Sequence, residues 1–425
     1  MSLIIFIATL GATLATGVPV AFALVICAVT MGLELDLFDP QIITQRLVVG
    51  ANNFSLLAIP FFLLAGELMN AGGMSKRIIA FAMAFVGHLR GGLGVVAIFA
   101  AIILASLSGS AAADTAALIS ILVPMMRAAG HDEARSVGLM ASGGIIAPII
   151  PPSIAYIIFG VATNLSISQL FMAGIVPGAM MGISALAVWI FVARRENVKP
   201  LPRQPWSARL RATREAVWAL GLPAIILGGI RFGIVTPTEA AVIAAVYALF
   251  VGLVIHRELK IAELFMVFRN AALTTSVVMM LAAAALATSW FIAIADLSGI
   301  VLDLVAPLVD HPRILLLAIM ALILVIGTML DMGPTILILA PVLLPVVEEA
   351  GIDPIYFGVI FVINTAIGLV TPPVGIVLSV SAGVSGVPMH KVAHGSLPFL
   401  AAQVGVLLLL VMFPQLVLTP LGWLR

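Results

Sequence analysis

Charged residues are scarce in this sequence, and cysteine is almost absent. Asp, Glu, Lys and Arg make up 9% of the 425 residues, whereas a soluble domain carries about 25% charged residues. The single cysteine, Cys27, excludes a disulfide framework. The formal net charge of +1 disfavours a nucleic-acid-binding surface. The sequence also has no Walker-type phosphate loop and no Gly-x-Ser-x-Gly motif, so it predicts neither an ATPase nor an acyl-transfer enzyme.

Apolar residues take the place of the missing charges. They make up 63% of the chain, and the mean hydropathy is +1.26. Apolar runs long enough to cross a lipid bilayer recur along the whole sequence, which is typical of a polytopic helical membrane protein. The opening stretch, "MSLIIFIATLGATLATG", has no basic residue before its apolar run, so we interpret it as a retained membrane helix. Residues 2–15 form either a separate helix or the first half of a kinked one.

The few charges are distributed asymmetrically. Residues 194–215 hold seven basic and two acidic residues, and the positive-inside rule places this stretch in the cytoplasm. Counting outward from it gives crossings at about 18–33, 53–70, 134–164, 168–193, 216–233, 237–256, 262–292, 355–385 and 395–418. Every Lys and Arg then lies on the cytoplasmic side except Arg46, Arg231, Arg313 and Arg425.

The sequence repeats itself at an offset of 221 residues. This shift aligns Pro124 with Pro345, Gly130 with Gly351, Asp132 with Asp353, Pro151-Pro152 with Pro372-Pro373, Gly174 with Gly395, and Pro177 with Pro398. Between the copies the number of crossings is odd if residues 74–90 lie along the membrane interface, a placement that Lys76, Arg77, His88 and Arg90 favour, so the second copy should be inverted relative to the first. Inverted repeats with interrupted helices are typical of secondary transporters. We therefore predict a first repeat at 1–193, a basic cytoplasmic linker at 194–215 and a second repeat at 216–425.

Each predicted repeat contains two interruptions. Two apolar arms surround a small polar centre at about 91–128, and again at about 312–350, which favours re-entrant hairpins. Paired full spans satisfy the charge distribution equally well. The following helix of each copy, at about 134–164 and about 355–385, is broken by two consecutive prolines. These helix-breaking residues are Pro151, Pro152, Pro372 and Pro373.

Broken helices expose carbonyl oxygens, and the hairpin centres carry hydroxyl and carboxylate oxygens. These are ligands that suit Na⁺, a hard cation, so we predict one cation site per repeat. The predicted cation-binding residues are Ser108, Ser110, Ala147, Ile149 and Pro152 in the first copy, and Thr328, Asp331, Thr371 and Val374 in the second. The predicted substrate contacts are Ser110, Ser153 and Asn364. We expect no cofactor and no metal besides Na⁺, because His390 and His394 have the spacing of a zinc pair but lack a third ligand.

Several stretches resemble one transporter family. The segments "AIPFFLLAGELMNAGG", "SLSGSAAADTAA", "ASGGIIAPIIPPSI", "TPTEA", "LDMGPTILILAPVLLP" and "GLVTPPVGI" are similar to the large membrane subunit of tripartite ATP-independent periplasmic (TRAP) transporters, especially the diketogulonate-type system. The resemblance implies an elevator-type, Na⁺-driven importer of organic acids in the bacterial inner membrane. It also implies a small four-helix membrane subunit and a periplasmic solute-binding protein as partners. In that family, positions matching Ser108, Ser110, Asp331 and Thr371 hold Na⁺.

The combined expectation is an all-α polytopic membrane protein with two inverted repeats, each with a re-entrant hairpin and a Pro-Pro-broken helix. Its predicted function is Na⁺-coupled, binding-protein-dependent import of a sugar acid, a keto acid or a dicarboxylate. The alternatives are a single-component Na⁺/carboxylate symporter, an intramembrane enzyme, and a pore or scaffold subunit without coupling. The sequence shows no nucleophile–base pair and no metal constellation for an enzyme.

Overall fold

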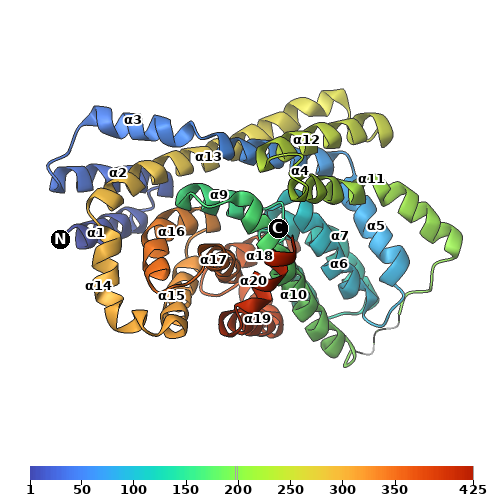
Figure 1. Cartoon of the computed structure of the whole chain (residues 1–425). Helices are drawn as coiled ribbons and strands as arrows, with labels where there is room; N and C mark the ends of the chain where they lie inside the picture. The colour runs from blue at the N-terminus through green and yellow to red at the C-terminus, as the bar shows by residue number, and fades with distance from the viewer. Residues whose placement is uncertain (197, 199, 425) are drawn as a thin grey trace.

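The computed structural model describes the backbone of residues 1–196, 198 and 200–424, and all regular structure in this part of the chain is helical (Figure 1). Side chains are described for the same residues except 106–108 and 424. The first half contains α1 (Ser2–Ala15), α2 (Val20–Glu34), α3 (Pro40–Ala51), the 3₁₀ turn η1 (Phe54–Leu57), α4 (Ala58–Ala71), α5 (Met74–Val86), α6 (Gly92–Ser108), α7 (Ala111–Ala129), α8 (Glu133–Gly144), α9 (Ile154–Thr163) and α10 (Ile167–Ala193). The second half contains α11 (Trp206–Arg231), α12 (Pro237–Phe250), the π-helical turn η2 (Val251–Ile255), α13 (Ile261–Ile294), α14 (Leu297–Val309), α15 (Pro312–Gly327), α16 (Met332–Glu349), α17 (Pro354–Gly368), α18 (Ile376–Ser385), α19 (Met389–Met412) and α20 (Gln415–Leu424).

The helices confirm the prediction of a polytopic all-α membrane protein. Among the described residues, eight helical segments are long and apolar enough to cross a membrane. Further apolar helices of 10–17 residues include the two halves of the second broken helix, α17 and α18. Helix α17 lies at the centre of the packed core, and its residues from Ile355 to Gly368 are all buried.

The internal repeat is visible in the packing as well as in the order of the helices. Elements α6 to α10 recur as α15 to α19 in the same sequence. Helix α9 packs against α16, and the repeat-related helix α18 packs against α7. Helix α2 likewise packs against α13, and its counterpart α12 packs against α4. The two copies thus exchange equivalent contacts, as expected for halves related by a pseudo-two-fold axis.

The first helix of each broken pair, α8 and α17, is capped in the same way in both copies. Asp132 accepts a hydrogen bond from the Arg135 N–H at 2.8 Å and caps α8. At the repeat-related position, Asp353 accepts one from the Tyr356 N–H at 2.9 Å and caps α17. An aspartate at this position satisfies an N–H group that has no partner inside the helix. The alignment that identified the repeat therefore contains residues that fix where each broken helix begins.

One element differs between the copies. In the first half α3 and α4 are separate helices joined through η1, whereas in the second half α13 is a single helix of 34 residues. Helix α13 packs against α2, α3 and α4 and runs across the upper part of the molecule in Figure 1. Asn52 and Asn53 lie at the interruption, and the Asn53 side chain accepts a hydrogen bond from the Ser55 N–H at 2.9 Å. Asparagine supports such local turns by bonding to the backbone.

The structure decides one boundary that the sequence left open and corrects several predicted ones. Residues 2–15 form a separate helix, α1, because the chain turns at Gly17 with a φ of 81° before Pro19. Helices α3 and α14 were not predicted, because with 12 and 13 residues each is too short to be counted as a membrane crossing. Helix α11 begins at Trp206, so ten residues of the predicted linker 194–215 are helical. The last predicted crossing, 395–418, is divided between α19 and α20.

The predicted orientation can be checked by labelling. Gln204 is exposed in the connection between α10 and α11, and the native Cys27 is buried, so a cysteine at 204 would be the accessible thiol. We expect Gln204→Cys to react with a membrane-impermeant maleimide in inside-out vesicles and not in intact spheroplasts. The matched control is Asp303→Cys on α14, which should give the opposite pattern. Labelling of Gln204→Cys from the periplasm would invert the assigned topology.

Candidate functional site

Both predicted helix breaks are present. The first lies between the end of α8 at Gly144 and the start of α9 at Ile154, and the second lies between Gly368 and Ile376. Each break contains a cis peptide bond between its two prolines. The two breaks differ in their exposure. Residues 145–153 of the first break are all buried, whereas Val374 in the second break is 43% exposed.

Each hairpin tip meets the break of its own copy. In the first copy, α6 and α7 join at Gly109, which has a φ of 62°. A Cβ atom at Gly109 would lie 3.3 Å from both the carbonyl oxygen of Pro152 and the nitrogen of Ile154, so only a glycine allows this approach. In the second copy, the Gly375 N–H donates a hydrogen bond of 3.1 Å to the carbonyl oxygen of Thr328. The structure therefore brings together the segments that the sequence predicted to face each other.

The carbonyl groups of the two breaks differ in their hydrogen bonding. No hydrogen bond from the described residues reaches the carbonyl oxygens of Ala147, Ile149 and Pro152. In the second copy, the Thr328 carbonyl accepts the bond from Gly375, and the Val374 carbonyl accepts one from the Ser379 hydroxyl at 3.3 Å. Carbonyl oxygens have two lone pairs, so all five retain capacity for a cation.

The predicted polar side chains occupy helix starts and ends at these tips. Ser110 is the N-cap of α7 and accepts a hydrogen bond from the Ala113 N–H at 3.4 Å. Asp331 is the N-cap of α16 and accepts one from the Met332 N–H at 2.8 Å. Thr371 lies just after α17, and its hydroxyl donates to the Ile367 carbonyl at 2.8 Å. The side chain of Ser108 lies outside the described residues.

Two predicted substrate contacts have other partners in this conformation. Ser153 is completely buried, where its hydroxyl donates to the Pro148 carbonyl at 2.5 Å and accepts from the Tyr156 N–H at 3.3 Å. It caps α9. Asn364 is also completely buried, and its side-chain amide donates to the Met320 carbonyl at 2.6 Å across the contact between α15 and α17. Neither residue lines the cavity between the two copies.

A cavity of about 440 Å³ lies between the two tips. The first residues of five helices line it, namely those of α2, α7, α9, α16 and α18. Its polar side chains, among the described lining residues, are Ser110, Thr274 and Asp331, and no Lys or Arg lines it. The N-terminal end of a helix carries a partial positive charge and unpaired N–H groups. The cavity can therefore attract an anion through helix ends and a cation through Asp331.

One wall of this cavity was not predicted from the sequence. That wall comes from α2, α4 and α13, and it includes Leu63, Thr274 and Val277. Thr274 is its polar member, and its hydroxyl donates to the Asn270 carbonyl at 3.1 Å. The available signal was the polar triplet Thr274-Thr275-Ser276 within the apolar part of α13 that follows Asn270.

Comparison with known proteins gives a consistent result. Residues 7–416 match the family model of the DctM component of the tripartite ATP-independent periplasmic transporter. The chain is 53% identical over 428 residues to the 2,3-diketo-L-gulonate TRAP transporter large permease protein YiaN of Escherichia coli, covering 100% of both chains. It is 37% identical to the sialic acid TRAP transporter large permease protein SiaM of Vibrio cholerae, covering 95% of this chain and 94% of that one. The solved YdaH transporter of Alcanivorax borkumensis has a TM-score of 0.67 at 14% identity, covers 91% of this chain and 90% of its own, and supports the fold alone.

Proposed function

The chain belongs to the DctM family of tripartite ATP-independent periplasmic (TRAP) transporters, the large permeases of the bacterial inner membrane, and on this premise we propose that it imports a small organic acid together with Na⁺. The observation that carries the proposal is the cavity between the two hairpin tips. It combines five helix N-termini with the Asp331 carboxylate at the level where both copies are interrupted. These groups suit an organic anion and a cation bound side by side.

The coupling follows from electrostatics. A carboxylate substrate and Asp331 repel each other in a cavity with no Lys or Arg among its described lining residues. A Na⁺ ion bound near Asp331, Thr371 and the Thr328 carbonyl removes this repulsion, so the anion binds more tightly when Na⁺ is present. A second Na⁺ held at the first tip by the open carbonyls of the break would attract the anion directly. Binding of each species strengthens binding of the other, which is the requirement for symport.

The family also supports the proposed partners. Membership of this family implies a small membrane subunit and a periplasmic binding protein as partners of the large permease. We propose that this chain works with both. The substrate class is a sugar acid, a keto acid or a dicarboxylate. Because YiaN bears the name of a 2,3-diketo-L-gulonate transporter and is 53% identical, that compound is the first to test.

Reconstituted uptake tests this function directly. The chain and its small subunit are placed in proteoliposomes, and radiolabelled 2,3-diketo-L-gulonate is added with the periplasmic binding protein. We expect accumulation against the substrate gradient only with an inward Na⁺ gradient and only with the binding protein. Equal uptake without that protein would instead favour a single-component symporter. Equilibration without accumulation would indicate a pore, and chemical conversion of the compound would indicate an enzyme.

A further inference from the structure

A buried arginine near the start of α11 has nitrogen atoms without a hydrogen-bond partner. Arg209 lies in the first turns of this helix and is 7% exposed. Its Nε and Nη2 atoms are buried and have no partner among the described residues. A charged group that has lost its hydration without gaining a partner is unfavourable. Arg209 is therefore suited to a negatively charged group from outside this chain.

The surface next to Arg209 is aromatic. The guanidinium carbon lies 5.8 Å from the centre of the Phe85 ring, which belongs to the last turn of α5. The rings of Phe81 and Phe85 are 4.8 Å apart, centroid to centroid, and that of Phe99 on α6 is 6.2 Å from Phe81. Helices α5, α6 and α11 pack against one another here, on the right-hand side of Figure 1. Because Phe99 is 39% exposed, this surface can contact an apolar chain outside the protein.

The start of α11 has the features of a membrane interface, on the side that the charge distribution assigns to the cytoplasm. Helix α11 is long and apolar enough to cross a membrane, and Arg209 lies near its first residue. Trp206 and Leu210, next to Arg209 on the helix, are 70% and 62% exposed. Tryptophan is typical of the zone where the lipid headgroups meet the hydrocarbon core. A phospholipid headgroup in this leaflet therefore lies at about the depth of Arg209.

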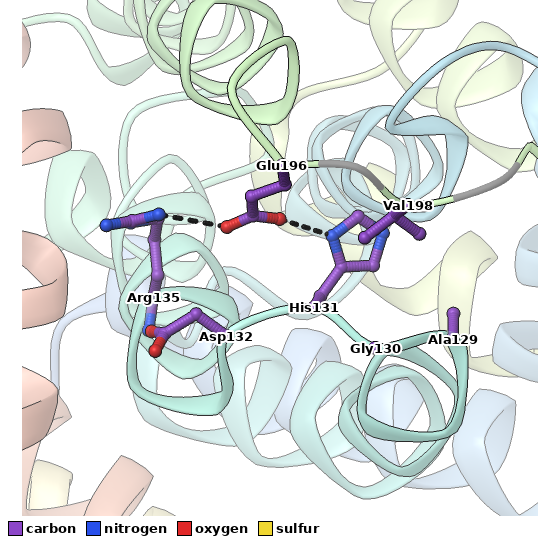
Figure 2. Close-up of a pocket in the computed structure, with 7 residues that line it drawn as sticks. All are labelled: Ala129, Gly130, His131, Asp132, Arg135, Glu196 and Val198. Atoms are coloured by element: carbon purple, nitrogen blue, oxygen red, sulfur yellow. Dashed lines mark hydrogen bonds and ion pairs between the residues drawn. The ribbon is translucent and has the colours of Figure 1, made fainter.

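The two acidic residues of the segment 194–215 do not neutralise Arg209. Glu196 lies 2.6 Å from His131 Nδ1 through one carboxylate oxygen and accepts from Arg135 Nη1 at 2.9 Å through the other (Figure 2). Glu215 lies six residues after Arg209 on α11, so it projects from a different side of the helix. The guanidinium group of Arg209 is thus left for an external anion.

Further basic residues lie on the connections that follow α5 and α10. Arg90 follows α5, and its Nη2 atom donates a hydrogen bond of 3.3 Å to the Arg194 carbonyl at the end of α10. The Arg195 guanidinium lies 4.5 Å from the ring centre of Phe191, an exposed residue of α10. His88, also after α5, has a buried Nδ1 atom without a partner among the described residues. Basic clusters on the cytoplasmic side of a membrane protein attract anionic lipid headgroups.

We propose that Arg209 binds the phosphate group of an anionic phospholipid in the cytoplasmic leaflet, and that the acyl chains of this lipid lie on Phe81, Phe85 and Phe99. The Nε and Nη2 atoms form one edge of the guanidinium group, so both can donate to oxygen atoms of the same phosphate. The aromatic rings supply the apolar part of the same site. The proposal depends neither on the transported compound nor on the coupling ion.

Native mass spectrometry can measure this binding. The chain is purified with its small subunit in detergent and titrated with phosphatidylglycerol, which is anionic, or with phosphatidylcholine, which is zwitterionic. We expect the first phosphatidylglycerol to bind about tenfold more tightly, as one charge-assisted hydrogen bond would give. Arg209→Gln should abolish this preference. The matched control, Arg211→Gln, removes the same charge from an exposed position on the opposite side of α11 and should keep it.

Further arms of the experiment separate the lipid from other anions and partners. Arg209→Lys keeps the charge without the planar guanidinium, so it should bind phosphatidylglycerol with intermediate affinity, and it replaces Arg209→Gln if that variant does not fold. Native affinity in either Arg209 variant would overturn the proposal. Displacement of the lipid by excess inorganic phosphate would assign Arg209 to a soluble phosphate compound instead. A preference shown by the chain alone and lost in the complex would mean that the small subunit covers Arg209, and the lipid assignment would be wrong.

Discussion

Replacing Asp331 with asparagine is expected to abolish the Na⁺ dependence of uptake or to raise the Na⁺ half-saturation at least tenfold, which corresponds to about 1.4 kcal/mol. Asp331 is the carboxylate of the cavity and caps α16 through the Met332 N–H. Asparagine is an equally good N-cap, so the helix start should survive while the negative charge is lost. The measurement is initial uptake rate against Na⁺ concentration in proteoliposomes.

The control for this substitution is another N-cap aspartate of the same repeat. Asp353 caps α17 through the Tyr356 N–H and does not line the cavity. Asp353→Asn should therefore leave the Na⁺ dependence as in the native protein. If Asp331→Asn also retains native coupling, Asp331 is no cation ligand and the second predicted site has to be reassigned.

Changing Pro372 and Pro373 together to alanine is expected to give a folded protein with uptake near background. Proline cannot continue a helix because it lacks the N–H donor and clashes with the preceding turn, at about 3 kcal/mol per residue. Without both prolines, α17 and α18 can join through residues 369–375, and the Thr328–Gly375 contact between tip and break is then lost. Size-exclusion chromatography and circular dichroism measure folding, and proteoliposome uptake measures function.

A proline inside an uninterrupted helix provides the comparison for this variant. Pro398 lies within α19, which continues from Met389 to Met412. Pro398→Ala should keep most of the native uptake, because no interruption exists there to be repaired. Native transport by the double alanine variant at 372 and 373 would show that the second break has no part in the mechanism.

The interruptions of the helices were predictable from the sequence, whereas their three-dimensional neighbours were not. Paired prolines and small polar centres are local signals, and they correctly indicated both breaks and both tips. Ser153 illustrates the limit: its position after two prolines suggested a substrate contact, yet its hydroxyl caps α9. The Asn364 side-chain amide donates a hydrogen bond to the carbonyl of Met320, 44 residues away in the sequence. Such long-range partners leave no local pattern.

The same limit applies to the cavity wall. Thr274 reaches the cavity because α13 crosses the molecule between the two copies, a placement that depends on packing rather than on the residue itself.

The length of α13 has a consequence for the surrounding lipid. The apolar part of this helix after Asn270, residues 271–294, extends about 36 Å, whereas the hydrocarbon core of a bilayer is about 30 Å thick. Such hydrophobic mismatch is relieved when the helix tilts or when the membrane thickens locally. In bilayers built from longer acyl chains, α13 should tilt less from the membrane normal. Because α13 forms one wall of the cavity, acyl-chain length should then change the transport rate without any change in the protein.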